Sequence, residues 1–176
     1  MRSAVRRIGG GSEPALAHGQ LVAPARMASS NEDEEYDSDT TVTMREFEDH
    51  VDVNTFSQIL EMDEESHDFS MPLVVNFFEQ ADETFEKMDL ALEASDLGEL
   101  SRLGHFLKGS SATLGFTKIK DSCQIIQQYG HHLNVDGSPE ADDSVCLKRI
   151  TEALKAVKVD KEELKKKMDK FFRLDE

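Results

Sequence analysis

The sequence has no tryptophan, only two cysteines and four prolines, and no apolar run long enough to cross a bilayer. A membrane-spanning helix needs about 20 consecutive apolar residues, so we predict no transmembrane segment. Cys123 and Cys146 lie far apart, without a Cys-x-x-Cys spacing, and no secretory leader is recognisable. We therefore expect two reduced, buried thiols, and neither a disulfide nor a cysteine metal site.

Basic residues are also scarce, since 20 Lys and Arg face 36 Asp and Glu and the formal net charge at pH 7 is −16. Nucleic acids and anionic membranes repel such a chain, so the predicted partner is another protein. A Gly-rich phosphate loop is missing, which argues against a nucleotide site. The chain has 176 residues, of which 38% are hydrophobic. That is enough for one packed domain with tails.

The N-terminal part differs in kind from the rest. Residues 1–30 contain four arginines and a single acid, and residues 31–39 (NEDEEYDSD) contain six acids. Such segments bury too little apolar surface to order themselves. We therefore predict a disordered tail over residues 1–50 and one folded domain over residues 51–176. The Arg-rich start is also compatible with a mitochondrial transit peptide or with translation beginning at Met27, so the fate of residues 1–26 stays open.

The remaining chain is typical of helices, because no segment alternates with a period of two and apolar residues recur three and four apart. Capping and breaking residues divide it into five expected helices. The first is a short helix that Asn54 caps and that ends at Leu60 or Met62, and the second starts at Ser70 or a neighbour. Ser95 caps the third, which Gly115 ends, and Thr117 caps the fourth, which Gly130 stops. After a loop at 134–144, the last helix covers 147–171. This pattern predicts an all-α, antiparallel four-helix bundle with the short N-terminal helix packed across it.

The third expected helix carries an unusual histidine. Its buried stripe consists of four leucines: Leu100, Leu103, Leu107 and Leu114. At a rotation of about 100° per residue, His105 points roughly 170° away from that stripe, toward solvent. Around it stand Lys108, Gly109 and Ala112, where a soluble helix normally carries long charged side chains. The helix surface is therefore bare around one histidine.

This arrangement favours phosphoryl relay. A glycine inside a helix costs about 1 kcal/mol relative to alanine, so Gly109 needs a compensating purpose. A missing side chain one turn from His105 lets another macromolecule bring a reactive group against the ring. A neutral imidazole is a competent nucleophile at cellular pH, and Lys108 can hold its ammonium near an anionic group on the ring. Positioning and charge stabilisation are most of what phosphoryl transfer requires.

The stretch from His105 to Gly115 (HFLKGSSATLG) resembles the His-x-x-Lys-Gly-Ser-Ser-x-x-x-Gly signature of histidine-containing phosphotransfer (HPt) domains, in particular those of fungal phosphorelay intermediates of the budding-yeast type. The resemblance extends from Thr55 to His132. It is weaker in the C-terminal helix, which matches only in kind, and it is absent from residues 1–50.

The resemblance implies roles for individual residues. His105 is the expected phosphorylated residue, Lys108 offsets the charge of the phosphoimidazole, and Gly109 keeps the approach open. Gln127 matches the family glutamine that hydrogen-bonds the imidazole from the neighbouring helix. The expected receiver-binding residues are Thr55, Ile59, Met62, Leu73, Phe106 and Ser110. Where the family has a basic residue, this chain has His131, which makes a charge contact there pH-dependent.

The resemblance also implies a function. The protein is expected to accept a phosphoryl group from the receiver domain of a hybrid sensor kinase and to pass it to a response regulator, as a monomer in the cytoplasm and nucleus. The chain itself is expected to hold no metal or cofactor, because the required Mg²⁺ belongs to the receiver. Alternatives are a helical adaptor that binds receivers without carrying phosphate and a bacterial-type module cut from a hybrid kinase. Which kinase, regulators and stimulus it serves is left open.

Overall fold

The computed structural model describes residues 47, 49–64 and 66–173, which all lie in one compact unit. Within these residues the secondary structure consists of five helices without a named strand. They are α2 (Val53–Leu60), α3 (Ser70–Glu93), α4 (Leu97–Thr113), α5 (Thr117–Gly130) and α6 (Asp143–Phe171). None of these helices combines the length and the hydropathy that a bilayer crossing requires. The predicted tail falls, up to residue 46, outside the described residues.

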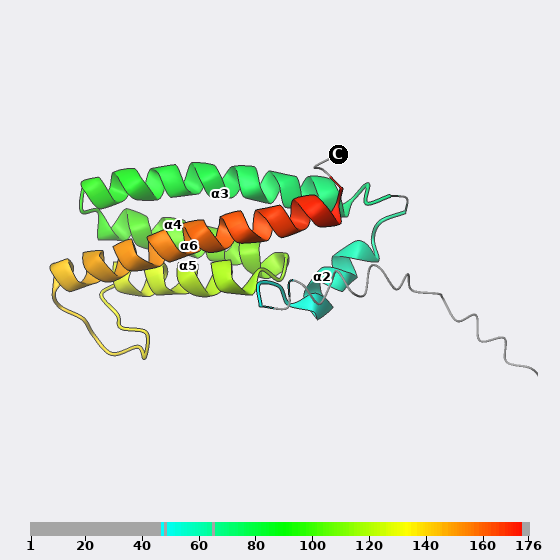
Figure 1. Ribbon diagram of the computed structural model, residues 1–176. Coiled ribbons are helices and arrows are strands. Elements are labelled where there is room, and N and C mark those ends of the chain that lie inside the picture. The colour runs from blue at the N-terminus through cyan, green and yellow to red at the C-terminus, as the bar shows by residue number, and fades with distance from the viewer. Residues whose placement is uncertain (1–46, 48, 65, 174–176) are drawn as a thin grey trace, which may run out of the picture. The chain divides into compact units, whose positions relative to one another are not determined.

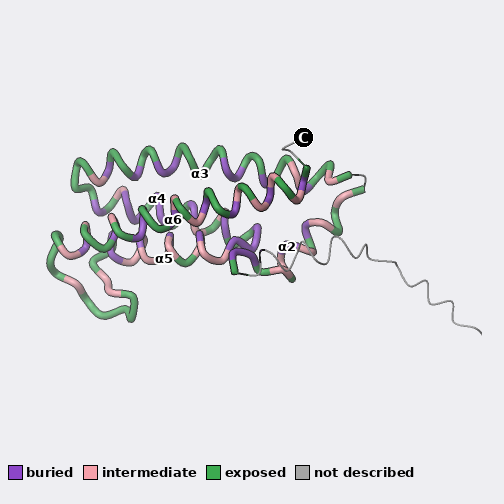
Figure 2. The backbone as a smooth tube through the Cα atoms, in the orientation of Figure 1, coloured by how far each residue is buried: buried purple, intermediate pink, exposed green. Residues whose placement is uncertain are grey.

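Helices α3 to α6 form the antiparallel four-helix bundle predicted from the sequence (Figure 1). Helix α4 packs against α3 and α5, and α6 closes the bundle by packing against α5 and α3. Figure 2 shows purple segments recurring along the facing sides of these helices and green segments along the outer sides. The apolar residues repeat three and four apart, so each helix buries one stripe in a common core.

Helix α2 lies at the end of the bundle where α4 turns into α5 (Figure 1). Its Phe56 is fully buried in a cluster of aromatic rings, with ring-centroid distances of 6.3 Å to Phe116 and 6.5 Å to Phe47. Phe47 and His50, which precede the predicted domain boundary at residue 51, are buried as well. The folded unit therefore begins earlier than predicted, because Phe47 gains by leaving water for this cluster.

Two predicted N-caps lie one or two residues away from the residues that do the capping. The carboxylate of Asp52, and not Asn54, caps α2 by accepting hydrogen bonds from the backbone N–H groups of Asn54 and Thr55. Asp96 caps α4 by accepting from the Glu99 N–H at 2.9 Å, while Ser95 has a left-handed φ of 55° just before it. The capping patterns in the sequence located the correct helix starts. At both starts, however, a nearby aspartate caps the helix in place of the predicted Asn or Ser, because a carboxylate interacts more strongly with the helix N-terminal dipole.

The turn between α4 and α5 confirms Gly115 as the residue that ends α4. Its φ of 74° is in the left-handed region. Its N–H donates to the Ala112 carbonyl, and the N–H of Phe116 donates to the Ser111 carbonyl. This hydrogen-bond pair satisfies carbonyl groups that a helix end otherwise leaves open. Thr117 is the first residue of α5 and makes no side-chain cap.

Gly130 does not stop α5 in the manner expected, because it is itself the last residue of the helix and is buried. A Cβ at this position would lie 2.7 Å from the backbone N of Ser101 on α4. Helix α6 likewise begins at Asp143, inside the predicted loop at 134–144, because Asp142 accepts a hydrogen bond from the Ser144 N–H at 2.8 Å. Both cysteines are free and buried, as predicted.

Candidate phosphotransfer site

His105 lies on the solvent side of α4, opposite its buried leucines, as the helical spacing predicts. Leu100, Leu103, Leu107 and Leu114 are all at most 3% exposed, whereas His105 is exposed. The imidazole ring of His105 is therefore presented by a rigid helix whose other face is fixed in the core. A group presented in this way loses little further freedom when a partner docks.

Gln127 on α5 holds one nitrogen of the ring. Its side-chain Nε2 lies 3.2 Å from Nδ1 of His105. Within the described part of the chain, Nε2 of His105 has no hydrogen-bond partner. The arrangement orients the ring through one nitrogen and leaves the other for chemistry, which agrees with the role expected for Gln127.

Lys108 is also held by α5. Its Nζ donates a hydrogen bond to Oε1 of Gln124 at 2.9 Å, and its side chain is half-buried. His105 and Lys108 are one turn apart on α4, and Gln127 and Gln124 are one turn apart on the antiparallel α5. Two glutamines thus hold the two functional side chains in matching register. We call these four residues the relay ladder.

Gln124 was not identified from the sequence. A polar residue three positions before Gln127 falls on the same face of α5, and this spacing is the signal that could have revealed it. What the spacing alone could not supply was the register of α5 against α4, which depends on the length of the turn at Gly115. The structure fixes that register and so adds Gln124 to the site.

Gly109 borders open space. It is exposed, and a Cβ built on its backbone would meet no other atom within 4 Å. Nothing within the described part of the chain therefore requires glycine here for packing. Since glycine also weakens the helix, the bare surface beside His105 is consistent with access for another macromolecule.

Three of the predicted receiver-binding residues are exposed apolar side chains. Met62 is 59% exposed, Phe106 45% and Leu73 37%. Leu73 lies in a groove of about 310 Å³ between α3 and α4. The groove is lined by Leu73, Asn76, Phe77, Gln80, Ser110, Thr113 and Leu114. Phe106 does not line the groove, but it lies one turn before Ser110 on the same face of α4, between the groove and His105 along the helix.

The other predicted receiver-binding residues have different surroundings. Ile59 is only 9% exposed and belongs to the core, because it lies on the face of α2 that packs on the bundle. Thr55 is half-buried and donates its hydroxyl to Oδ2 of Asp52 at 3.1 Å. Ser110 donates its hydroxyl to Oε1 of Gln80 on α3 at 3.2 Å. Ile59, which the family resemblance implied as a receiver-binding residue, is therefore a core residue, because α2 contributes more of its surface to the core than the resemblance suggested.

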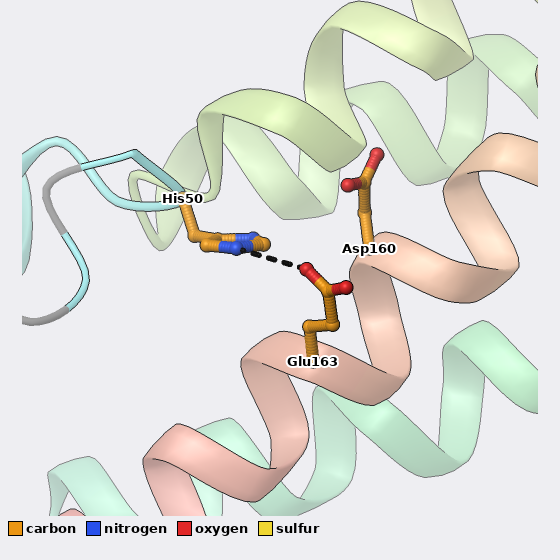
Figure 3. A group of neighbouring side chains, drawn as sticks. All are labelled: His50, Asp160 and Glu163. Carbon is orange, nitrogen blue, oxygen red and sulfur yellow. Dashed lines mark ion pairs between the residues drawn. The ribbon is translucent and has the colours of Figure 1, made fainter.

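His50 belongs to a second group of polar residues, one that was not predicted. Figure 3 shows Glu163 of α6 pointing toward His50, with Asp160 one turn away on the same helix. The ligand atoms of these three residues lie within 4.8 Å of one another. However, Nζ of Lys118 lies 3.3 Å from Nε2 of His50, the nitrogen that is 3.5 Å from Oε2 of Glu163. A lysine ammonium therefore occupies the direction in which this nitrogen would bind a cation.

The charge state of His50 follows from this environment. Burial lowers the pKa of His50, and Lys118 and Lys167 lower it further, against the raising effect of Asp160 and Glu163. A neutral imidazole at Nε2 can accept the hydrogen bond of Lys118. Contacts of a neutral His50 side chain with Lys118 and Glu163 thus connect the segment before α2 to helices α5 and α6.

Comparison with known proteins decides the family. The model of the Hpt domain matches residues 72–160. The chain belongs to the Hpt domain family. The matched segment begins in the first turn of α3 and extends into α6, so it includes all four residues of the relay ladder and the whole of α4.

Two curated relatives of this Hpt protein come from fungi. The phosphorelay intermediate protein YPD1 of Candida albicans is 51% identical over 86 residues, which is 49% of this chain and 47% of that protein. The multistep phosphorelay regulator 1 of Schizosaccharomyces pombe is 46% identical over 109 residues, which is 61% of this chain and 37% of that protein. The chain spans about half or less of the length of these relatives.

A solved structure is similar to this Hpt fold over most of the described chain. It is the co-crystal structure of the Saccharomyces cerevisiae histidine phosphotransfer signaling protein Ypd1 with the receiver domain of its downstream response regulator Ssk1. The TM-score is 0.62 and the identity 30%, and the alignment covers 70% of this chain and 94% of that chain.

Proposed function

We propose that this protein is a phosphorelay intermediate that carries a phosphoryl group on His105. It accepts the group from the phosphoaspartate of a receiver domain in a hybrid sensor kinase and passes it to the aspartate of a response regulator. The observation that carries this proposal is an exposed His105 whose Nδ1 lies 3.2 Å from the Gln127 amide, on a surface that Gly109 leaves open. The complex of the yeast protein with a receiver domain supports this class of partner.

In the transfer, the lone pair on Nε2 of His105 forms a bond to phosphorus while the bond from phosphorus to the aspartate oxygen breaks. The carboxylate leaves with the electron pair. When Gln127 presents Oε1 to the ring, Nδ1 keeps its proton, and Nε2 keeps the lone pair that attacks. The same contact stabilises the phosphorylated ring until the second receiver arrives, and the reverse bond changes then regenerate the neutral histidine.

The partner supplies the rest of the chemistry. Lys108 offsets charge on the phosphorylated ring, and the Mg²⁺ that the transfer requires belongs to the receiver domain. The chain acts as a carrier, as a monomer in the cytoplasm and nucleus, with no nucleotide or kinase site and no cofactor of its own. The missing Gly-rich phosphate loop supports this part of the proposal.

Phosphotransfer from a purified, phosphorylated receiver domain tests the proposal. We expect the wild-type protein to acquire an acid-labile, base-stable label and the His105→Gln variant to acquire none, with its melting temperature nearly unchanged because the side chain is exposed. His132→Gln, which changes another exposed histidine that pairs with Asp143 of α6, is the matched control and should label normally. Label retained in His105→Gln would refute the proposal. Receiver binding without any label would instead identify an adaptor.

A further inference from the structure

Gly104 is buried at the closest approach of α4 and α5. A Cβ built on it would lie 2.9 Å from the backbone N of Gln127 and 3.0 Å from the carbonyl oxygen of Cys123. Both atoms belong to the backbone of α5, which cannot move aside as the end of a side chain could. Any residue larger than glycine would therefore push the two helices apart at this point.

One of the two crowded atoms belongs to Gln127, the residue whose side chain holds the ring of His105. Gly104 directly precedes His105 in the chain. The atom nearest to a Cβ built on Gly104 is the backbone nitrogen of Gln127. One turn earlier on α4, the buried Ser101 donates its hydroxyl to the carbonyl oxygen of Gln127 at 3.0 Å. The backbone of Gln127 is thus located by α4 at both its amide nitrogen and its carbonyl oxygen.

We propose that Gly104 is a positioning residue for the phosphotransfer reaction, because its close contact with Gln127 brings the glutamine amide within hydrogen-bond distance of Nδ1 of His105. The inference deepens the proposed function of His105 and rests on it. Oε1 of Gln127 is buried and lacks a hydrogen-bond partner among the described residues. If the amide turns over, Oε1 accepts the Nδ1 proton and Nε2 of the ring keeps its lone pair. Either orientation requires the spacing that Gly104 allows.

The test is the Gly104→Ala variant, observed through the imidazole nitrogen NMR signals of unphosphorylated His105. These signals report which ring nitrogen carries the proton and whether Nδ1 is hydrogen-bonded. We expect the signals of Gly104→Ala to shift toward those of Gln127→Ala. The matched control is Gly98→Ala on the same helix, where a Cβ would meet only Oδ1 of Asp96 at 3.6 Å. Its signals should equal those of the wild type.

Transfer rates give the second measurement. We expect Gly104→Ala to slow transfer on the order of tenfold, as small misplacements of reacting groups do, and the change to be non-additive with Gln127→Ala because both act on one contact. Unchanged ring signals in a folded Gly104→Ala protein would overturn the inference even if transfer were slower. The readout does not require phosphorylation, so its failure is distinct from failure of the relay function.

A second variant keeps the inference testable if alanine at position 104 prevents folding. Ser101→Ala removes the hydroxyl that binds the Gln127 carbonyl and adds no bulk. We expect a smaller shift of the His105 ring signals in the same direction. If Ser101→Ala folds and leaves these signals unchanged, the contact of α4 with the Gln127 backbone does not position the ring.

Discussion

Gly104 and Gly109 are five residues apart on α4, and their surroundings are opposite. A Cβ at Gly104 would contact the backbone of α5, whereas a Cβ at Gly109 would contact nothing within 4 Å. Gly104 lets two helices pack closely inside the protein, and Gly109 is proposed to leave room for a partner. The consequences of substitution at the two positions should therefore separate stability from transfer.

We expect Gly109→Gln to keep or raise the melting temperature, because glutamine is a better helix former by up to about 1 kcal/mol. Phosphotransfer should become much slower, because the new side chain occupies the approach to His105. Thermal unfolding and the rate of transfer from a phosphorylated receiver measure the two effects. Gly98→Gln, another exposed helix glycine, should gain stability and transfer normally. A wild-type rate in Gly109→Gln would show that access is not its role.

At the scale of single elements, helix α3 has its N-terminal cap in the preceding loop. Asp63 accepts hydrogen bonds at Oδ1 from the N–H groups of Phe69 and Ser70, at 2.9 and 2.7 Å, and at Oδ2 from the Ser70 hydroxyl. Burial alone would raise the pKa of Asp63, but the hydrogen bonds from Ser70, Phe69 and His67 outweigh burial and lower it. The start of α3 therefore depends on an ionised carboxylate.

A lowered carboxyl pKa gives stability that is present above the ordinary value of 3.8 and is lost as the pH falls through the lower value of the folded state. We expect Asp63→Asn to lower the free energy of unfolding at pH 7 by about 1 kcal/mol, as for other caps. The difference from wild type should shrink as the pH falls below 3.8. Denaturant unfolding between neutral and acidic pH measures it.

The control for this cap is Asp121→Asn, which changes an exposed carboxylate on α5 that lies 3.4 Å from Lys120. We expect it to leave the stability and its dependence on acid almost unchanged. An equal effect of Asp63→Asn and Asp121→Asn would contradict the assignment of Asp63 as the cap of α3.

The sequence was sufficient to predict where the helices lie, but it predicted less well which residues cap them and how the helices contact one another. Apolar spacing placed all five helices and the exposure of His105, since a helix turns at a constant rate. It missed Asp63, because a cap seven residues away is a matter of loop geometry. It did not reveal Gln124, and the family resemblance did not show that Ile59 belongs to the core, because both facts depend on how separate helices meet. The roles expected of Lys108, Gly109 and Gln127 stay predictions.

At the scale of the whole molecule, one apolar surface lies beside one reactive histidine. Leu73 is exposed and lines the groove between α3 and α4, and Phe106 is exposed one turn before Ser110 of that groove. Any receiver domain must bring its aspartate within bonding distance of the same ring. We therefore expect the upstream donor and the downstream acceptor to use this surface in turn.

We predict that Phe106→Ala weakens binding of both receiver domains by more than about 1 kcal/mol, the usual loss at an aromatic anchor, and that the two domains compete. Calorimetric titration of one receiver into the complex of the other measures both effects. Leu90→Ala is the matched control, since Leu90 is an exposed apolar residue near the far end of α3. A ternary complex, or loss of one partner only, would show that the surface is not shared.

The turn at Gly115 limits how the length of this chain can vary. It is fixed on both sides, because the Asp52 N–H donates to the Gly115 carbonyl and the Thr117 N–H donates to the His50 carbonyl. One inserted residue would rotate α5 by about 100° and carry Gln127 and Gln124 away from α4. The connection between α5 and α6 is held chiefly by hydrogen bonds within itself, such as the one from the Asn134 N–H to the Ser138 carbonyl. Insertions, affinity tags and fluorescent reporters should therefore be tolerated in the exposed loop at 135–138. The same insertions placed at 115–116 should disrupt the contacts of the relay ladder.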